Sequence, residues 1–106
     1  MTIEILYVAD CPHVGPAVEM VRRVLAAEGL TGHIETILVQ DQDEAQAFQF
    51  LGSPTIRVGG EDVEPADAGT YACLGCRLYS NPQNPGQPSE ESVRRALRRA
   101  AGRGMA

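Results

Sequence analysis

Residues 3–13, Ile3-Glu4-Ile5-Leu6-Tyr7-Val8-Ala9-Asp10-Cys11-Pro12-His13, run from a nearly continuous apolar segment directly into a cysteine. An apolar run of this kind is typical of a strand that is covered on both faces in a parallel sheet. Residues 14–28 then place apolar side chains at helical spacing, and Gly29 follows as a residue that commonly closes helices. The sequence therefore predicts a central strand over 3–9 and a helix over 14–28, with Cys11 at their junction.

The remaining segments extend this pattern to an α/β domain. Residues 33–40 predict a second strand, parallel to the first because a helix connects the two. An acidic start at 41–44 predicts a short helix that ends at Gly52, and the Gly59-Gly60 pair predicts a hairpin between strands 55–58 and 61–64. Ser89 is the expected N-cap of a last helix. The predicted order is β-α-β-α-β-β-α.

Residues 65–88 have no periodic pattern and are rich in glycine, proline and asparagine, so they predict a long loop. The loop contains Cys73-Leu74-Gly75-Cys76, a complete Cys-x-x-Cys that lies away from any strand-to-helix junction. Long loops inside compact domains are uncommon and tend to be functional. The loop is therefore a candidate part of the functional site.

A second short segment, Gly52-Ser53-Pro54-Thr55, opens the strand at 55–58. Together with the junction at Cys11, it resembles the thioredoxin superfamily, in which the reactive cysteine opens the first helix and a cis-proline loop faces it. The resemblance covers nearly the whole chain except the long loop. It implies one thioredoxin-like domain over residues 1–106, a four-stranded mixed sheet with helices on both faces, and a cis bond before Pro54. It also implies that Ser53 presents backbone polar groups to an extended substrate.

Cys11 is the leading candidate nucleophile, because orphan N–H groups and the positive end of the helix dipole favour a thiolate at the start of a helix. The segment Cys11-Pro12-His13-Val14 looks like the Cys-Pro-His-Cys active site of the bacterial periplasmic disulfide oxidases, with Val14 in place of the second cysteine. His13 could add positive charge near the sulfur when protonated. The predicted substrate-binding residues are Pro12, His13, Ser53 and Pro54.

Because Val14 stands in place of the second cysteine, the sequence is compatible with three functional hypotheses. In the predicted topology the chain returns to the Cys11 end after the hairpin, so Cys76 or Cys73 could act as the resolving thiol in thiol–disulfide exchange, which needs no cofactor. Alternatively, Cys11, Cys73 and Cys76 could bind a soft metal or metalloid ion such as mercury, arsenite or copper(I). A third reading is a non-catalytic thioredoxin-like scaffold that binds a partner protein. Enzymatic activity is therefore an open question at this stage.

Composition limits the partners. The chain has 106 residues and a net charge of −5, and no basic stripe is interleaved with aromatic residues, which argues against nucleic acid and anionic membrane surfaces. No apolar stretch approaches the ~18 residues of a membrane span, and the amino terminus lacks the positive region of a signal peptide. We therefore expect a cytoplasmic protein whose three cysteines act as reactive thiols or metal ligands, with protein or small-molecule thiols and disulfides as partners.

Overall fold

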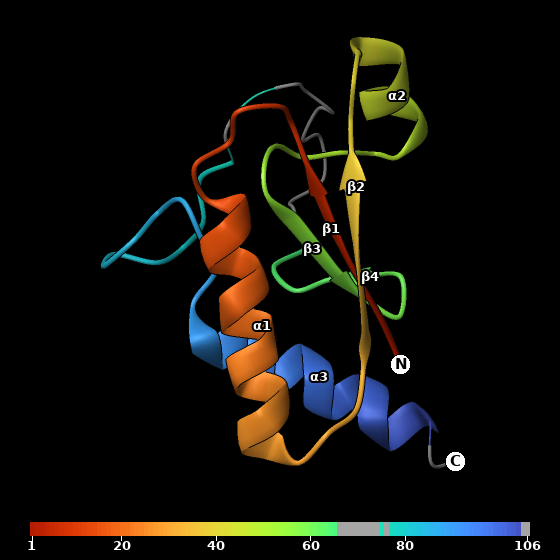
Figure 1. Ribbon diagram of the computed structural model, residues 1–106, viewed down its shortest axis with the longest axis vertical. Coiled ribbons are helices and arrows are strands. Elements are labelled where there is room, and N and C mark those ends of the chain that lie inside the picture. Colours follow the sequence, from red (N-terminus) through yellow and green to blue (C-terminus); the bar gives the residue numbers. More distant parts are fainter. Residues whose placement is uncertain (66–74, 76, 105–106) are drawn as a thin grey trace.

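The computed structural model describes residues 1–65, 75 and 77–104. Within these residues the chain is an α/β domain with a four-stranded mixed sheet and three helices (Figure 1). The elements follow the predicted order: β1 (Thr2–Tyr7), α1 (Val14–Glu28), β2 (His33–Leu38), α2 (Gln42–Ala47), β3 (Thr55–Val58), β4 (Glu61–Asp62) and α3 (Glu90–Gly104).

The strands lie in the order β2-β1-β3-β4. β1 pairs in parallel with β2 and antiparallel with β3, and β3 pairs antiparallel with β4. The predicted interior position of the first strand is thus confirmed, as is its parallel partner, which α1 connects to it. The arrangement leaves β2 at one edge of the sheet and β4 at the other.

The two faces of the sheet are covered unequally. Ile3 and Ile5 of β1 belong to the larger core, which α1 and α3 close from the same side of the sheet (Figure 1). Leu6 points to the opposite face, where it packs with Ala45 of α2 and with Phe50. α2 is short and lies beyond the upper end of β2, so it covers only that end of the second face.

α1 has the predicted bounds, and α3 begins after the predicted N-cap. Gly29 follows α1 with a left-handed φ of 66°. At α3, the side chain of Ser89 accepts a hydrogen bond from the N–H of Ser92 at 3.1 Å. This bond satisfies one of the donors that a helix start leaves unpaired.

α2 ends at Ala47, five residues before the predicted end at Gly52, so that prediction is wrong. The N–H of Phe50 donates to the Ala45 oxygen, the N–H of Gln49 donates to the Gln46 oxygen, and Gln49 has a φ of 53°. This is a Schellman motif with glutamine in the left-handed position that glycine usually takes. Burial of Phe50 beside Ala45 accompanies the early stop.

Three strands are shorter than predicted. β1 ends at Tyr7 and β2 at Leu38, although the N–H of Val39 still donates to the Tyr7 oxygen at 2.8 Å. β4 stops at Asp62, although the N–H of Val63 still donates to the Ile56 oxygen of β3 at 3.0 Å, and the Asp62 carboxylate accepts the N–H of Glu64 at 2.8 Å. Among the described residues, none of the helices is both long enough and apolar enough to cross a membrane.

Candidate functional site

Cys11 lies in the turn that joins β1 to α1. Its N–H donates to the Val8 oxygen at 3.3 Å, and Asp10 before it has a left-handed φ of 64°. The thiol is free and half-buried, so it is accessible to a reagent. The turn places Cys11 at the end of the sheet where β1 and β2 both finish.

Cys11 lies in the predicted junction between β1 and α1, but two residues before the N-cap, so it does not cap the helix. His13 is the N-cap of α1, and its side chain makes no capping bond. Pro16, in the first turn, has no N–H, which leaves that turn with fewer donors than usual. The helix can therefore act on the Cys11 sulfur through its dipole, but not through a capping hydrogen bond.

The Ser53–Pro54 peptide bond is cis, as predicted. The Ser53 hydroxyl accepts a hydrogen bond from the Val8 N–H at 3.1 Å. Val8 is the residue that also accepts the Cys11 N–H. One residue at the end of β1 therefore ties the cis-proline segment to the cysteine turn.

The backbone N–H and C=O of Ser53 both already have hydrogen-bond partners within the chain. Its N–H donates to the Gly75 oxygen at 2.7 Å, and its own oxygen accepts the Arg77 N–H at 3.0 Å, which is the pattern of a parallel bridge. Ser53 is 0% exposed, and the oxygen of buried Pro54 accepts the hydroxyl of Tyr79. The expectation that Ser53 and Pro54 contact an extended substrate is not met in this conformation, because the chain's own loop holds that place.

Arg77 anchors the loop in the protein interior. Its side chain is 7% exposed, its Nη1 donates to Asp62 Oδ2 at 2.7 Å, and its Nη2 donates to the backbone oxygen of Glu64. The guanidinium carbon lies 4.4 Å from the centre of the Tyr79 ring, within the range of a cation–π contact. The N–H of Ser80 donates to the Glu64 carboxylate. We call Arg77, Asp62, Glu64 and Tyr79 the loop anchor.

The charges of the loop anchor match its burial. Burial disfavours the charged form of Arg77, but the hydrogen bond to Asp62 and the nearby charges outweigh that cost, so the pKa of Arg77 lies above its usual value. Burial also raises the pKa of Tyr79 and keeps its phenol neutral. Leu78, between Arg77 and Tyr79, is 81% exposed and takes no part in the loop anchor.

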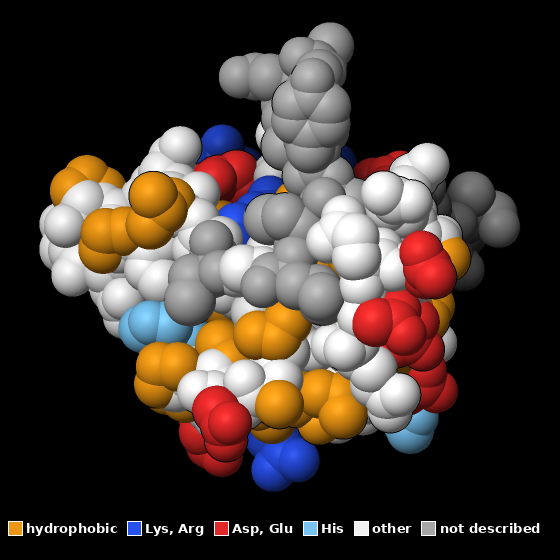
Figure 2. Space-filling view, turned by 90° about the horizontal axis from the view of Figure 1, so that it is seen from above, with side chains coloured by type: hydrophobic (Ala, Val, Ile, Leu, Met, Phe, Trp, Pro, Cys, Tyr) orange, Lys and Arg blue, Asp and Glu red, His pale blue; other side chains and the backbone are white. Residues whose placement is uncertain are grey.

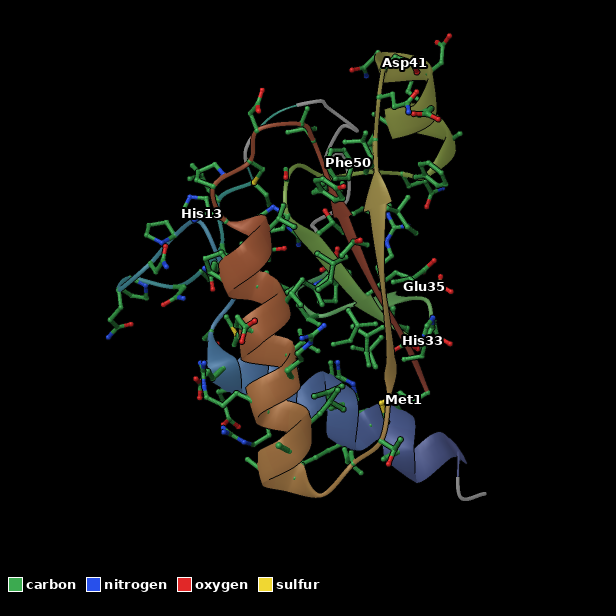
Figure 3. All side chains as sticks on the ribbon, in the orientation of Figure 1. Met1, His13, His33, Glu35, Asp41 and Phe50 are labelled. Atoms are coloured by element: carbon green, nitrogen blue, oxygen red, sulfur yellow. The ribbon has the colours of Figure 1, made fainter. Side chains whose placement is uncertain are left out.

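His13 lies against the second half of the loop (Figure 3). A Cβ atom added at Gly86 would come within 2.5 Å of the His13 ring, so the absence of a side chain there makes room for the imidazole. The sequence predicted His13 as a charge near the sulfur and did not predict this contact. Pro12 is exposed beside Cys11.

Cys73 and Cys76 lie outside the described residues, so their predicted roles stay predictions. Among residues 1–65, 75 and 77–104, no group of three or more His, Cys, Asp or Glu side chains could hold a metal ion. The described neighbours of Cys76 are Gly75 and Arg77, the two residues that bond to Ser53.

An apolar hollow of about 430 Å³ lies beside the cysteine turn. It is lined by Val8, Ala9, Leu38, Val39 and Gln40, at the ends of β1 and β2. Figure 2 looks onto this end of the molecule and shows hydrophobic side chains grouped on it. Two of its lining residues, Val8 and Ala9, belong to the chain that leads from β1 to Cys11.

The chain matches no family model, no curated protein and no solved structure.

Proposed function

We propose that the chain is a thioredoxin-like thiol protein that carries out thiol–disulfide exchange, with Cys11 as the attacking thiol and Cys76 as the resolving thiol. One observation supports the proposal above the others. The Cys11 turn bonds to Val8, Val8 bonds to Ser53, and Ser53 bonds to both sequence neighbours of Cys76. Three segments that are far apart in the sequence are thus connected by consecutive hydrogen bonds at one end of the sheet.

The proposed reaction has two exchange steps. The Cys11 thiolate attacks one sulfur of a substrate disulfide, a mixed disulfide forms, and the other substrate sulfur leaves as a thiolate. The Cys76 thiolate then attacks the Cys11 sulfur, which forms the Cys11–Cys76 disulfide and releases the second substrate thiolate. Two electrons pass from the two protein thiols to the substrate. A thiol reductant returns the protein to its dithiol form.

Cys76 is preferred over Cys73 because of the residues that flank it. Gly75 and Arg77 bond to Ser53, and Arg77 is fixed by the buried ion pair with Asp62. A disulfide requires Cα atoms within about 7 Å, so an anchored chain near the cysteine turn favours the nearer thiol. Cys73 lies three residues further from this anchor in the sequence.

The occupied backbone of Ser53 limits how a substrate binds. A second extended chain would have to displace Gly75 and Arg77 to pair with Ser53. The route that remains is over the exposed Pro12 and the apolar hollow that contains Ala9 and Leu38. This geometry favours a small-molecule disulfide, or a disulfide on a protein surface, over an extended polypeptide.

Mild oxidation followed by peptide mapping tests the proposal. We expect a Cys11–Cys76 linkage in the wild type and in Cys73→Ser, and no linkage to Cys11 in Cys76→Ser. A Cys73–Cys76 linkage with free Cys11 would move the chemistry into the loop and contradict the proposal.

The same oxidation, followed by a titration with a soft ion, separates the two alternative functions, soft-ion binding and a non-catalytic scaffold. If all three thiols resist oxidation but the protein binds one equivalent of mercury, arsenite or copper(I), the soft-ion binding function replaces exchange. If the thiols neither oxidise nor bind such an ion, a non-catalytic scaffold is the function that remains.

A further inference from the structure

The outer edge of β2 carries no partner strand among the described residues. β2 is the last strand in the order β2-β1-β3-β4, and neither α1 nor α2 lies across its edge in Figure 1. His33, Glu35, Thr36 and Leu38 of this strand are exposed. An edge of this length, with an unpaired backbone, is a template for another strand.

The backbone of β2 alternates between β1 and solvent. The N–H of His33 donates to the Met1 oxygen at 2.9 Å, and the N–H of Val39 donates to the Tyr7 oxygen at 2.8 Å. In a parallel pair, alternate residues direct both polar groups to the same neighbour, so the odd-numbered residues of β2 bond to β1. The N–H and C=O groups of Ile34, Thr36 and Leu38 therefore point outward.

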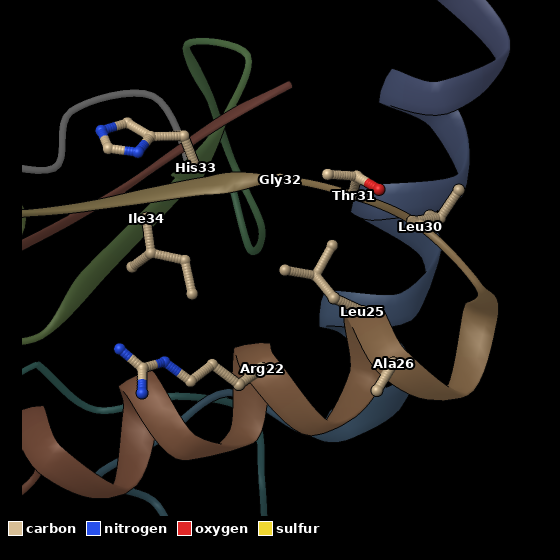
Figure 4. A pocket seen from close by; sticks show the side chains of 8 residues that line it. All are labelled: Arg22, Leu25, Ala26, Leu30, Thr31, Gly32, His33 and Ile34. Atoms are coloured by element: carbon tan, nitrogen blue, oxygen red, sulfur yellow. The ribbon is translucent and has the colours of Figure 1, made fainter.

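The same residues present side chains toward the face that α1 covers. Figure 4 shows Ile34 directed toward α1, while His33 lies on the other side of the strand. Ile34, Leu25, Leu30 and Arg22 line an open groove of about 500 Å³ between β2 and α1. Leu38, which is 38% exposed, lines the apolar hollow at the other end of β2. Half-exposed apolar side chains thus mark both ends of the edge.

We propose that the β2 edge is an interface for a second copy of this chain, paired antiparallel about a twofold axis that passes through Thr36. In this register Thr36 pairs with Thr36 of the second copy, and Ile34 of each copy pairs with Leu38 of the other. Every outward N–H and C=O of the strand then has a partner in the other copy. The two sheets join into one continuous sheet with the α1 helices on the same face.

The pattern of side chains selects this register. If one strand were shifted by one residue along the other, Ile34 would lie opposite a residue whose side chain points to the other face of the sheet. A symmetric pairing centred on Glu35 would set two carboxylates directly against each other, which is destabilising. Centring on Thr36 instead gives a Thr–Thr pair flanked by two Ile–Leu pairs, all of which favour pairing.

The charges at the two ends of the strand favour a second copy as the partner. Arg22 of α1 lies beside the beginning of β2, where His33 contacts Glu35 at 3.3 Å, and Asp41 and Asp43 follow the end of the strand. Antiparallel pairing brings Arg22 of one copy toward Asp41 and Asp43 of the other, twice over. A single strand pair buries less surface than a permanent dimer needs, so the association is weak and concentration-dependent.

Sedimentation velocity over a range from micromolar to millimolar chain, in the presence of a thiol reductant, tests the proposal. We expect the average mass of the wild type to rise from 11.4 kDa toward twice that value. Thr36→Lys places two like charges at the twofold axis, and Leu38→Lys removes an apolar pair, so both variants should stay monomeric. Leu78→Lys is the matched control, because Leu78 is 81% exposed in another part of the chain and should leave the association unchanged.

Thr36→Pro supplies a second test that depends on the backbone alone. Proline removes the outward N–H and leaves the bonds to β1 intact, a substitution that edge strands tolerate. Circular dichroism confirms that each variant is folded. A wild type that stays monomeric at millimolar concentration, or a dimer that survives Thr36→Lys and Thr36→Pro, overturns the proposal.

Discussion

Two sets of ion pairs hold distant parts of this chain together, and they differ in burial far more than in length. Inside the loop anchor, Arg77 lies 2.7 Å from Asp62, and their side chains are 7% and 13% exposed. Between α1 and α3, Arg98 lies 2.5 Å from Glu28, and here only the carboxylate is shielded, because Arg98 is 61% and Glu28 16% exposed. Arg23 and Glu90 form a further exposed pair between the same two helices.

Burial decides what each set does for the fold. An exposed pair exchanges hydration for a screened attraction, so it contributes little. A buried pair gives little net stability when it is complete, but the loss of one partner leaves a charge without water or a counterion. The exposed pairs link α1 and α3, which already pack together in the apolar core. The buried pair of Arg77 and Asp62 instead fixes the loop against Ser53.

Replacement of Arg77 should have the largest effect. Arg77→Met leaves Asp62 buried without its cation, so we expect the free energy of unfolding to fall by about 3–5 kcal/mol. Urea unfolding followed by circular dichroism measures this loss. Arg98→Met is the matched control, and its loss should be far smaller because Arg98 is 61% exposed and Glu28 keeps a second ion pair with Arg94.

A double variant separates the charge from the packing. In Arg77→Met with Asp62→Leu, no buried charge remains, and we expect much of the lost stability to return. If Arg77→Met and Arg98→Met cost the same, burial is not what distinguishes the two sets.

The next largest effect is expected where the loop anchor meets the cis-proline segment. Gly52 has a φ of 117°, and an added Cβ would lie 2.9 Å from the backbone N and Cα of Arg77. Gly52→Ala therefore combines backbone strain with a contact that no side-chain rotation relieves, and we expect a loss of about 1–3 kcal/mol. Gly60→Ala is the matched control, because Gly60 has a φ of 87° but nothing within 4 Å. A smaller loss in Gly52→Ala than in Gly60→Ala would show that the loop is not tightly packed there.

Periodicity predicted the element order, the bounds of α1, the N-cap Ser89 and the interior position of β1, because each depends on neighbouring residues. The end of α2 could not be predicted in this way, because glutamine rarely takes the left-handed position that Gln49 takes here. Cys11 lies in the predicted junction, but the turn that its N–H closes on Val8 was not predicted.

The contacts of the loop depend on residues far apart in the sequence. Arg77 reaches Asp62 and Glu64, and His13 lies against Gly86. No local pattern encodes either partnership. The sequence shows only a cation, Arg77, and an aromatic residue, Tyr79, beside Cys76, and neither identifies its partner.

Removal of one hydroxyl from the loop anchor should have a moderate effect. Tyr79→Phe keeps the ring beside Arg77 but leaves the Pro54 oxygen without its donor. We expect a loss of about 1–2 kcal/mol in urea unfolding at neutral pH. An unchanged stability would mean that the Pro54 oxygen finds another donor.

Alkaline pH should act on the same hydroxyl. The pKa of Tyr79 is raised by burial, so its stabilising effect is complete below the ordinary tyrosine value of 10.0 and is lost as the pH rises above it. We expect the wild type to lose stability above about pH 10, with a shallower loss in Tyr79→Phe. Equal slopes in the two proteins would show that another group causes the alkaline transition.

The smallest effect is expected at the exposed pairs, and it should appear only in acid. The hydrogen bond from Arg98 holds the pKa of Glu28 below its ordinary value of 4.5, and Arg23 does the same for Glu90. A lowered pKa gives stability that is present above the ordinary value and is lost as the pH falls through the lower one. Thermal unfolding from pH 6 to pH 3 should therefore show a shallower acid loss in Arg98→Ala than in the wild type. Added salt should narrow the difference, because exposed charges are screened. By contrast, salt should leave the loss in Arg77→Met nearly unchanged, since that pair is largely shielded from water and ions.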